Sequence, residues 1–462
     1  MKGINREILR LALPSILANI TVPLVGIVDT AIAGHIPSGV GFQAATYIGA
    51  ISVGALLFDL IYWNFGFLRA GTGGLAAQAY GAGNTKECAR IFYRGIDLAL
   101  ALALLTLALQ WPFVKVALLV VDASPEVEKL AADYFFARIW AAPATVSLMT
   151  FSGWFVGMQD SVSSMWKDLI VNIMNVVASL ILALGIGSWK GIGFIGIAWG
   201  TVIAQYSGLL FCIIVCKVKY SKVLKHFRIS KITEVFGRDA DIKSFFRMNA
   251  NLSLRSLSFI AIYIGYTMIA AKYGDLMLAC SSIMMQLLMI FSYFTDGFAY
   301  AGEAMTGKYI GARDLAMTRK TVRYVFIWSM SIAVVFIGIY RLCGVPLLHL
   351  MTSDAEVVEA CRAFLPWLVF MPPLGCAAFT WDGIYLGATD SASMRDSMVG
   401  AALLFILSWL VFKQIWQPYG ALAIHLLLAA YFVHLFFRTV FLSLRYKRNI
   451  LEKPFMNYEK DT

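Results

Sequence analysis

The sequence predicts an all-α integral membrane protein, with twelve transmembrane helices arranged as two six-helix pseudo-symmetric bundles around a central cleft. Three observations predict this fold class. Of the 462 residues 60% are hydrophobic and only 14% are charged, which lies far outside the range of soluble globular proteins. Apolar segments long enough to cross a bilayer recur along the whole chain. Landmarks of the first half also return in the second half at a nearly fixed offset.

Hydropathy along the chain defines the twelve apolar segments. They lie near 8–34, 43–71, 91–120, 130–157, 164–188, 192–216, 248–271, 276–303, 322–348, 357–388, 394–416 and 420–444. The basic stretch KVKYSKVLKHFRISK, at 217–231, is the one long polar connection and follows the sixth segment. We therefore expect four regions: an N-terminal bundle at 1–216, a basic cytoplasmic linker at 217–243, a C-terminal bundle at 244–445 and a cytoplasmic tail at 446–462.

Four short motifs of the first half recur in the second half in the same order. They are YGAGN at 80–84 with IGARD at 310–314, SPEV at 124–127 with DAEV at 354–357, GMQDSVS at 157–163 with GATDSAS at 387–393, and GFLRAG at 66–71 with GFAYAG at 297–302. Two halves of six helices each insert with the same orientation, so an axis along the membrane normal would relate them. This is the plan of a secondary transporter, with a site between the halves.

Basic residues are concentrated on one side of the predicted topology. An even number of helices puts both termini on the same side, and the loops of that side hold 27 Lys and Arg against six on the other. By the positive-inside rule both termini lie in the cytoplasm, with the protein in the cell inner membrane. The net charge of +11 thus reflects juxtamembrane residues facing the lipid bilayer, and no nucleic-acid partner is expected.

Enzyme chemistry finds no support in the sequence. There is no P-loop, no helical HExxH and no Ser/His/Asp grouping, and the five histidines are scattered. The seven cysteines lie mostly within apolar runs and are expected to be small core residues without disulfides. We therefore expect no catalytic residue, no metal and no cofactor.

A transporter driven by an ion gradient needs an ionisable group inside the membrane. The candidates within the apolar segments are Asp29, Asp59, Arg69, Arg138, Arg255, Asp296, Glu303, Arg362 and Asp382. For the arginines, snorkelling or pairing with a carboxylate is the alternative to substrate contact.

The C-terminal candidates allow two interpretations. Asp296 and Glu303 are seven residues apart, so they share one face of the eighth helix and would flank a polar cavity. Together with Arg255 they would instead form a structural ion network. Asp382 belongs to a segment that carries Pro372 and Pro373, where broken backbone usually lines a cavity. We predict a substrate-cleft or second polar site from this group.

Asp29 differs because it is the only charged residue between Leu11 and Gly34. The fifth and sixth segments carry the polar residues that would surround it: Asn172, Asn175, Ser179, Thr201 and Gln205. Asn172 and Asn175 are about one helical turn apart, and Ser179 lies four residues beyond Asn175 on the same helix face. They predict a polar chamber in the N-terminal half, with hydrogen bonds that merely pack helices as the alternative.

Four stretches resemble the multidrug and toxic compound extrusion (MATE) family, in its DinF-like branch. They are VDTAIAGH at 28–35, GLAAQAYGAGN at 74–84, DGFAYAGEAMTGKYIGA at 296–312 and DGIYLGATDSASMRDSM at 382–398. The resemblance covers almost the whole chain. It implies six plus six helices around a V-shaped cleft, and export of organic, often cationic compounds against an inward proton or sodium gradient.

The resemblance also implies roles for single residues. In such members an Asp of the first helix is the protonation site, and it corresponds to Asp29 here. The Asn of their fifth helix corresponds to Asn175, and the Thr of their sixth helix to Thr201. Members that resemble this chain often carry a second acid one turn after that Asn, where this sequence has Ser179. A single carboxylate favours protons over sodium as the coupling ion.

The sequence therefore predicts a monomeric antiporter that exports small amphipathic molecules by alternating access, driven by protons. The alternative is a lipid-linked saccharide flippase of the same superfamily, which would line its cleft with basic residues such as Arg69, Arg138 and Arg255. A membrane scaffold or receptor that transports nothing would not need Asp29 buried alone.

The topology can be tested by labelling single cysteines in a cysteine-free background. We expect Lys2→Cys and Lys222→Cys to react with a thiol reagent from the cytoplasmic side only, and Asp354→Cys from the outside only. The measurement is reaction with a membrane-impermeant maleimide in whole cells and in inverted vesicles. Labelling of all three from one side would contradict the predicted arrangement.

Overall fold

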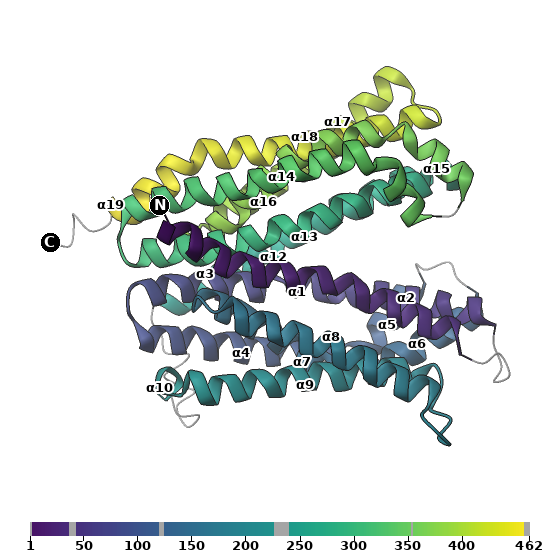
Figure 1. The fold of residues 1–462 in the computed structure, drawn as a ribbon, viewed down its shortest axis with the longest axis horizontal. Coiled ribbons are helices and arrows are strands. Elements are labelled where there is room, and N and C mark those ends of the chain that lie inside the picture. Colours follow the sequence, from purple (N-terminus) through teal and green to yellow (C-terminus); the bar gives the residue numbers. More distant parts are fainter. Residues whose placement is uncertain (1, 37–42, 120–123, 226–239, 353, 457–462) are drawn as a thin grey trace. The chain divides into compact units, whose positions relative to one another are not determined.

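A computed structural model describes residues 2–36, 43–119, 124–225, 240–352 and 354–456 of the chain (Figure 1). Helices account for nearly all of these residues, and the only β feature among them is an isolated bridge between Ile186 and Trp189. Eleven of the described helices are long and apolar enough to cross a membrane, or twelve if one bent pair counts as a single span. The predicted all-α membrane class is confirmed.

The helices of the first half of the chain, apart from one 3₁₀ turn at Ile139–Ala141, are α1 (Lys2–Gly34), α2 (Ala44–Phe65), α3 (Phe67–Gly81), α4 (Thr85–Ala108), α5 (Gln110–Leu118), α6 (Pro125–Arg138), α7 (Ala142–Gly157), α8 (Ser161–Leu184), α9 (Ile195–Lys219) and α10 (Ser221–Leu224). Pro14 and Pro23 do not interrupt α1, which continues to Gly34.

The helices of the second half are α12 (Ala240–Ala271), α13 (Asp275–Gly311), α14 (Leu315–Met351), α15 (Ala355–Arg362), α16 (Leu365–Gly387), α17 (Ser391–Trp416), α18 (Ala421–Tyr446) and α19 (Lys453–Met456), with a π-helical stretch at Lys447–Glu452. The predicted tenth segment is two helices, since α15 and α16 meet at an angle of 61°. Pro372 and Pro373 lie inside α16 without ending it.

Contacts between residues divide the chain into two units. We call the unit formed by Leu17–Ala76 and Asn84–Ile242 the N-terminal unit, and the unit formed by Met1–Ile16, Ala77–Gly83 and Lys243–Thr462 the C-terminal unit. The predicted boundaries at 216, 243 and 445 stay predictions. Residues 226–239 of the predicted linker and 457–462 of the predicted tail lie outside the described residues.

Three of the four repeated motifs mark the beginnings of helices. In each, a side-chain oxygen accepts a hydrogen bond from a backbone N–H of the first helical turn, and the capping residues are Asn84 and Asp314, Ser124 and Asp354, and Asp160 and Asp390. The first turn of a helix has N–H groups without partners in the helix itself, so such a cap stabilises the end by about 1 kcal/mol. The sequence repeat is therefore a repeat of helix starts.

The backbone just before two of these caps is also repeated. Gly83 and Arg313 precede one pair of caps with φ of 67° and 59°, and Gln159 and Thr389 precede another with φ of 63° and 58°. A left-handed residue reverses the chain in the shortest distance after a helix ends. Each half thus uses the same tight turn between consecutive helices.

Asp160 connects two helices as well as capping α8. Its Oδ2 accepts hydrogen bonds from Ser163 Oγ at 2.6 Å, Lys219 Nζ at 2.7 Å and Tyr220 Oη at 2.8 Å. Burial by itself raises the pKa of the Asp160 carboxyl, but the bonds from Lys219, Ser163 and Tyr220 hold that pKa below its ordinary value of 3.8. The stabilisation is complete above that ordinary value and is lost as the pH falls through the folded-state pKa.

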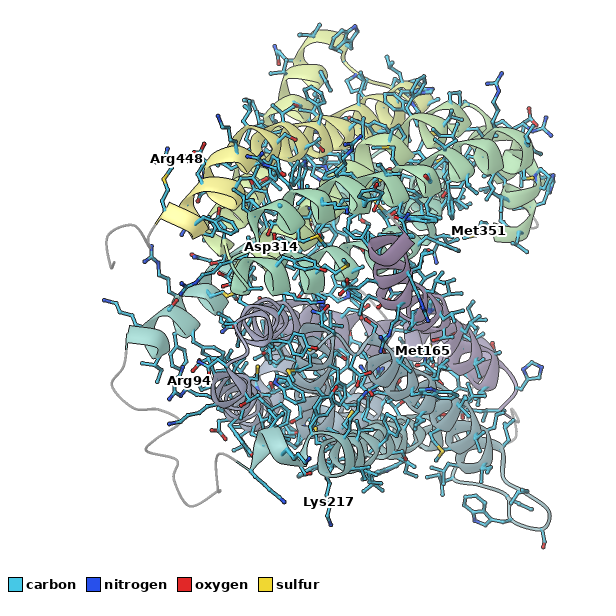
Figure 2. The ribbon with its side chains drawn as sticks, turned by 60° about the vertical axis from the view of Figure 1, so that its left-hand side comes forward. Arg94, Met165, Lys217, Asp314, Met351 and Arg448 are labelled. Atoms are coloured by element: carbon cyan, nitrogen blue, oxygen red, sulfur yellow. The ribbon has the colours of Figure 1, made fainter. Side chains whose placement is uncertain are left out.

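Basic side chains border the end of α9 beside this carboxylate. Lys217 is exposed and points away from the helices (Figure 2), and Lys219 keeps 54% of its side chain exposed while reaching Asp160. Such residues place the end of a membrane-spanning helix in the polar region next to the bilayer. Their position at a helix end agrees with the prediction that the charge of the chain is juxtamembrane.

Helices α8 and α9 lie side by side in very close contact (Figure 1). A Cβ on Gly200 would lie 2.6 Å from the backbone N and Cα of Ser179, and a Cβ on Gly196 would lie 2.5 Å from the backbone of Leu182. Real Cβ atoms essentially never approach so closely, so only glycine fits at these two positions. Small residues in this way let two membrane helices pack backbone against backbone.

The close contact predicts unequal effects for the same substitution at two glycines of the N-terminal unit. Gly200→Ala should destabilise the protein by about 1–3 kcal/mol because it overpacks α8 against α9. Gly26→Ala in α1 meets nothing within 4 Å, and should be neutral or stabilising by up to about 1 kcal/mol. The measurement is the thermal unfolding midpoint of the purified protein in detergent. Equal midpoints for the two variants would contradict the close packing.

Candidate functional site

Asp29 lies on α1 inside the N-terminal unit. It is 6% exposed, and its Oδ1 has no hydrogen-bond partner among the described residues. The neighbouring Thr30 does not help, because its hydroxyl donates to the Gly26 carbonyl at 2.8 Å. An ionised carboxylate is costly to bury without hydrogen bonds. Asp29 is therefore placed where gaining or losing a proton changes the local energy most.

Arg138 supplies the charge that acts on Asp29. The two side chains attract each other electrostatically, although no ion-pair contact joins them among the described residues. The guanidinium of Arg138 contacts its own helix and α2. Its Nη1 donates a hydrogen bond to Tyr134 Oη at 2.9 Å, and its Cζ lies 4.6 Å from the ring centroid of Phe58. Arg138 therefore has protein partners on α6 and α2, and whether it contacts a substrate stays a prediction.

Tyr134 extends the contacts from Arg138 towards α9. The Tyr134 side chain is fully buried and lies near Thr201 as well as Arg138. Its ring fits because position 54 on α2 is glycine, where a Cβ would lie 2.5 Å from the ring. Tyr134 and Arg138 were not singled out together in the sequence, although their spacing of four residues puts them on one helix face.

Asn175 and Thr201 join α8 to α9 by a hydrogen bond, the helix-packing alternative to the predicted polar chamber. Asn175 Nδ2 donates to Thr201 Oγ1 at 2.9 Å, and Thr201 Oγ1 donates to the Ile197 carbonyl at 3.3 Å. Asn175 and Thr201 are both buried, and Asn175 Oδ1 has no hydrogen-bond partner among the described residues. One acceptor therefore remains available beside the hydroxyl.

Ser179 occupies the position where an acid was expected in similar sequences. It is fully buried, its Oγ donates to the Ile197 carbonyl at 3.4 Å, and it faces Gly200. A carboxyl side chain here would have to displace closely packed backbone. The missing second acid thus has a steric reason in the contact between α8 and α9.

The two remaining candidates of the fifth and sixth segments are less buried. Asn172 Nδ2 donates to Thr21 Oγ1 at 2.6 Å, which connects α8 with α1 within the N-terminal unit. Thr21 itself was not identified from the sequence, since a lone threonine in an apolar helix gives no signal. Gln205 on α9 is half-buried and has no hydrogen bond within the described part of the chain. We call Asp29, Arg138, Tyr134, Thr201 and Asn175 the N-terminal polar group.

A separate charged cluster lies inside the C-terminal unit. Arg255 of α12 and Arg438 of α18 each place Nη2 on the same oxygen of Asp382 on α16, Oδ2, at 2.6 Å and 2.5 Å. Their side chains are 22% and 2% exposed, and that of Asp382 is 15% exposed. Arg255 therefore pairs with Asp382, and a network of Arg255 with Asp296 and Glu303 stays a prediction. We call these three residues the arginine cluster.

Arg438 was missed in the sequence, although it is an arginine inside the predicted segment at 420–444 and so carried a usable signal. Of the acids of α13, Glu303 is fully buried and Asp296 is half-buried, and the backbone of Glu303 packs against Gly387 of α16. No group of three His, Cys, Asp or Glu side chains suitable for a metal ion occurs among the described residues.

Comparison with known proteins gives consistent matches. A family model described as MatE matches residues 14–184 and 252–415. DNA damage-inducible protein F of Escherichia coli (strain K12) is 33% identical over 417 residues, which cover 89% of this chain and 88% of that protein. The probable multidrug resistance protein NorM of Neisseria meningitidis serogroup B is 23% identical, covering 78% of this chain and 76% of that protein. A crystal structure of MATE in the bent conformation shares the fold with a TM-score of 0.82 and 19% identity, covering 97% of this chain and 96% of that one.

The arginine cluster predicts different stabilities for two single substitutions. Asp382→Asn leaves two buried guanidinium groups without a counter-charge, which should destabilise the protein by about 3–5 kcal/mol. Arg438→Gln leaves a neutral pair of Arg255 and Asp382 and should be milder. The amount of folded protein in membranes and its thermal unfolding midpoint measure both. A variant Arg438→Gln that is as unstable as Asp382→Asn would show that charge balance is not what holds the cluster.

Proposed function

This chain belongs to the MatE family of multidrug and toxic compound efflux transporters, and from that premise we propose that it exports amphipathic organic compounds in exchange for protons. The protein is a multi-pass membrane protein. The observation that carries the proposal is Asp29, a buried carboxylate on a membrane-spanning helix with an oxygen that no described group satisfies.

The proposed mechanism couples the charge of Asp29 to the arrangement of the N-terminal unit. A charged carboxylate in an apolar surrounding favours any arrangement that exposes it to water or to a counter-charge, whereas a protonated one is tolerated when enclosed. A proton arriving from the outside would thus favour the enclosed arrangement. The contacts around Asp29 would change with it, and the exported compound would leave.

Protons fit the N-terminal polar group better than sodium does. A sodium ion would find one carboxylate, with Ser179 where a second would stand, and it would be repelled by the permanently charged Arg138 nearby. Asn175 Oδ1 offers a neutral acceptor only. A proton needs no further ligand once Asp29 has accepted it.

The substrate class and topology are proposed from the relatives and from the charge pattern. One relative is named for multidrug resistance, which supports drugs as substrates, and we propose that they are amphipathic and often cationic. The distribution of Lys and Arg supports an orientation in the inner membrane with both termini in the cytoplasm, and the protein is proposed to act as a monomer. The flippase alternative has less support, because Arg138 and Arg255 already have protein partners.

The test of the proposal replaces Asp29 by its neutral, nearly isosteric counterpart. Asp29→Asn should insert and fold, because the site is already short of hydrogen-bond donors and loses only a charge, but it should lose gradient-driven efflux by at least about tenfold, in the range of removing one essential proton-transfer group. The measurement is efflux of a fluorescent drug from energised cells, with protein amounts matched.

The matched control is Asp97→Asn, which makes the same change on α4, outside the N-terminal polar group. It should leave efflux unchanged. In proteoliposomes, adding drug to the wild-type protein should release protons, and Asp29→Asn should release none. Efflux that persists in Asp29→Asn, or that requires sodium and ignores a pH gradient, would refute proton coupling at Asp29.

A further inference from the structure

We propose that Cys280 and Cys361 form a disulfide bond that holds α15 on α13, on the side of the membrane opposite the cytoplasm. Both residues belong to the C-terminal unit, and neither takes part in the proton coupling proposed for Asp29. The proposal rests on the proposed orientation, with both termini in the cytoplasm. It departs from the expectation that the seven cysteines of the chain are core residues without disulfides.

The first argument is that the two thiols meet although they belong to different helices. Cys280 Sγ donates to the Val357 carbonyl at 3.9 Å, and the thiols of Cys280 and Cys361 lie near each other. In an α-helix a carbonyl accepts from the N–H four residues later, so the Val357 carbonyl lies beside the backbone of Cys361. Cys280 therefore approaches both the backbone and the thiol of Cys361, and a disulfide bond requires such an approach.

The second argument is the burial of the pair. Cys280 and Cys361 are both fully buried in the apolar core of the C-terminal unit, where α15 packs against α13. The rate of thiol–disulfide exchange depends on access to the sulfur atoms. A bond placed in this core would therefore persist once formed. The oxidant must act earlier, while the chain is inserted and before α15 packs against α13.

The third argument is the compartment in which the two thiols meet. Cys280 lies five residues after Asp275, where α13 begins, and Cys361 lies six residues after Ala355, where α15 begins. A helix rises about 1.5 Å per residue, so each thiol is within about 10 Å of the start of its helix along the axis. In the proposed orientation both helices begin on the outer side. Disulfides form and persist outside the cytoplasm and are rare within it.

The bond forms by exchange with an oxidant that carries a disulfide, such as a thiol oxidase of the outer compartment. One cysteine thiolate attacks a sulfur of the oxidant and forms a mixed disulfide. The thiolate of the other cysteine then displaces the oxidant's second sulfur and closes the bond between Cys280 and Cys361. The two cysteines together lose two protons and two electrons, and the oxidant becomes a dithiol.

Helix α15 is the part of the C-terminal unit that gains most from such a bond. It has only eight residues, and isolated helices of that length are marginal in water. The bond would also close a long loop that contains most of α13 and all of α14, and in the chain-entropy account the stabilisation grows with loop length. The 61° angle between α15 and α16 would then have one arm fixed on α13.

The direct test looks for the bond in wild-type protein purified from membranes without reductant. The protein is unfolded in excess N-ethylmaleimide, digested and analysed by mass spectrometry. We expect the peptides of Cys280 and Cys361 to be joined. Cys212 and Cys216, a buried pair near the end of α9 on the proposed cytoplasmic side, should both carry the maleimide. Maleimide on both Cys280 and Cys361 in most of the protein would overturn the proposal.

A thermal measurement tests whether the bond stabilises the protein. Dithiothreitol reaches the bond as the protein unfolds, and should lower the unfolding midpoint of the wild type by about 3 °C or more. Cys280→Ala has no bond to lose, so its midpoint should not respond.

The matched control is Cys376→Ala, which makes the same change at another buried cysteine of the C-terminal unit. Its midpoint should respond to dithiothreitol as that of the wild type does. An equal response of Cys280→Ala and Cys376→Ala would contradict the bond. None of these measurements involves transport, so failure of proton coupling at Asp29 would leave their reading intact.

Discussion

Every part of this structure depends on the absence of water from the bilayer interior. Backbone N–H and C=O groups there must find partners within the protein, and helices provide them for all residues except those at the ends. Small polar side chains therefore occur at helix ends, where Asn84, Asp160 and Asp390 cap the first turn. The same constraint makes each polar side chain within a helix expensive, so that the few which remain identify the functional regions.

The two units use buried charge in different ways. In the N-terminal unit the guanidinium of Arg138 interacts electrostatically with two carboxylates, those of Asp29 and Asp59. In the C-terminal unit two guanidinium groups converge on one carboxylate, and the cluster is positive. The repeat therefore conserves the architecture of the helix ends, whereas the interior chemistry of the two units has diverged. An acid that can gain or lose a proton suits the first environment, whereas ion pairs in the second connect α12, α16 and α18.

The sequence was sufficient for features that depend on neighbours along the chain. Hydropathy located the membrane-spanning helices. The sequence predicted a polar chamber from Asn175 and Thr201, with helix-packing hydrogen bonds as the alternative, and the hydrogen bond between these two residues is of the packing kind. The sequence alone did not predict contacts that depend on how two helices pack against each other. The attraction between Arg138 and Asp29 depends on where α6 lies relative to α1, and the pairing of Arg255 with Asp382 depends on how α12 packs against α16. Periodicity tells which face of a helix is polar but not which helix it meets.

The tight turns have a mechanical consequence. Only three residues separate α7 from α8, α13 from α14 and α16 from α17, and in each turn an aspartate caps the second helix directly after a residue with left-handed backbone. Connections this short leave little freedom between the two helices, so we expect each pair of helices to move as one rigid unit. Any change of shape must then be absorbed within the helices themselves. Such a bend is available in α16, which contains two prolines and meets α15 at an angle of 61°. Bending there leaves the short turn between α16 and α17 unchanged.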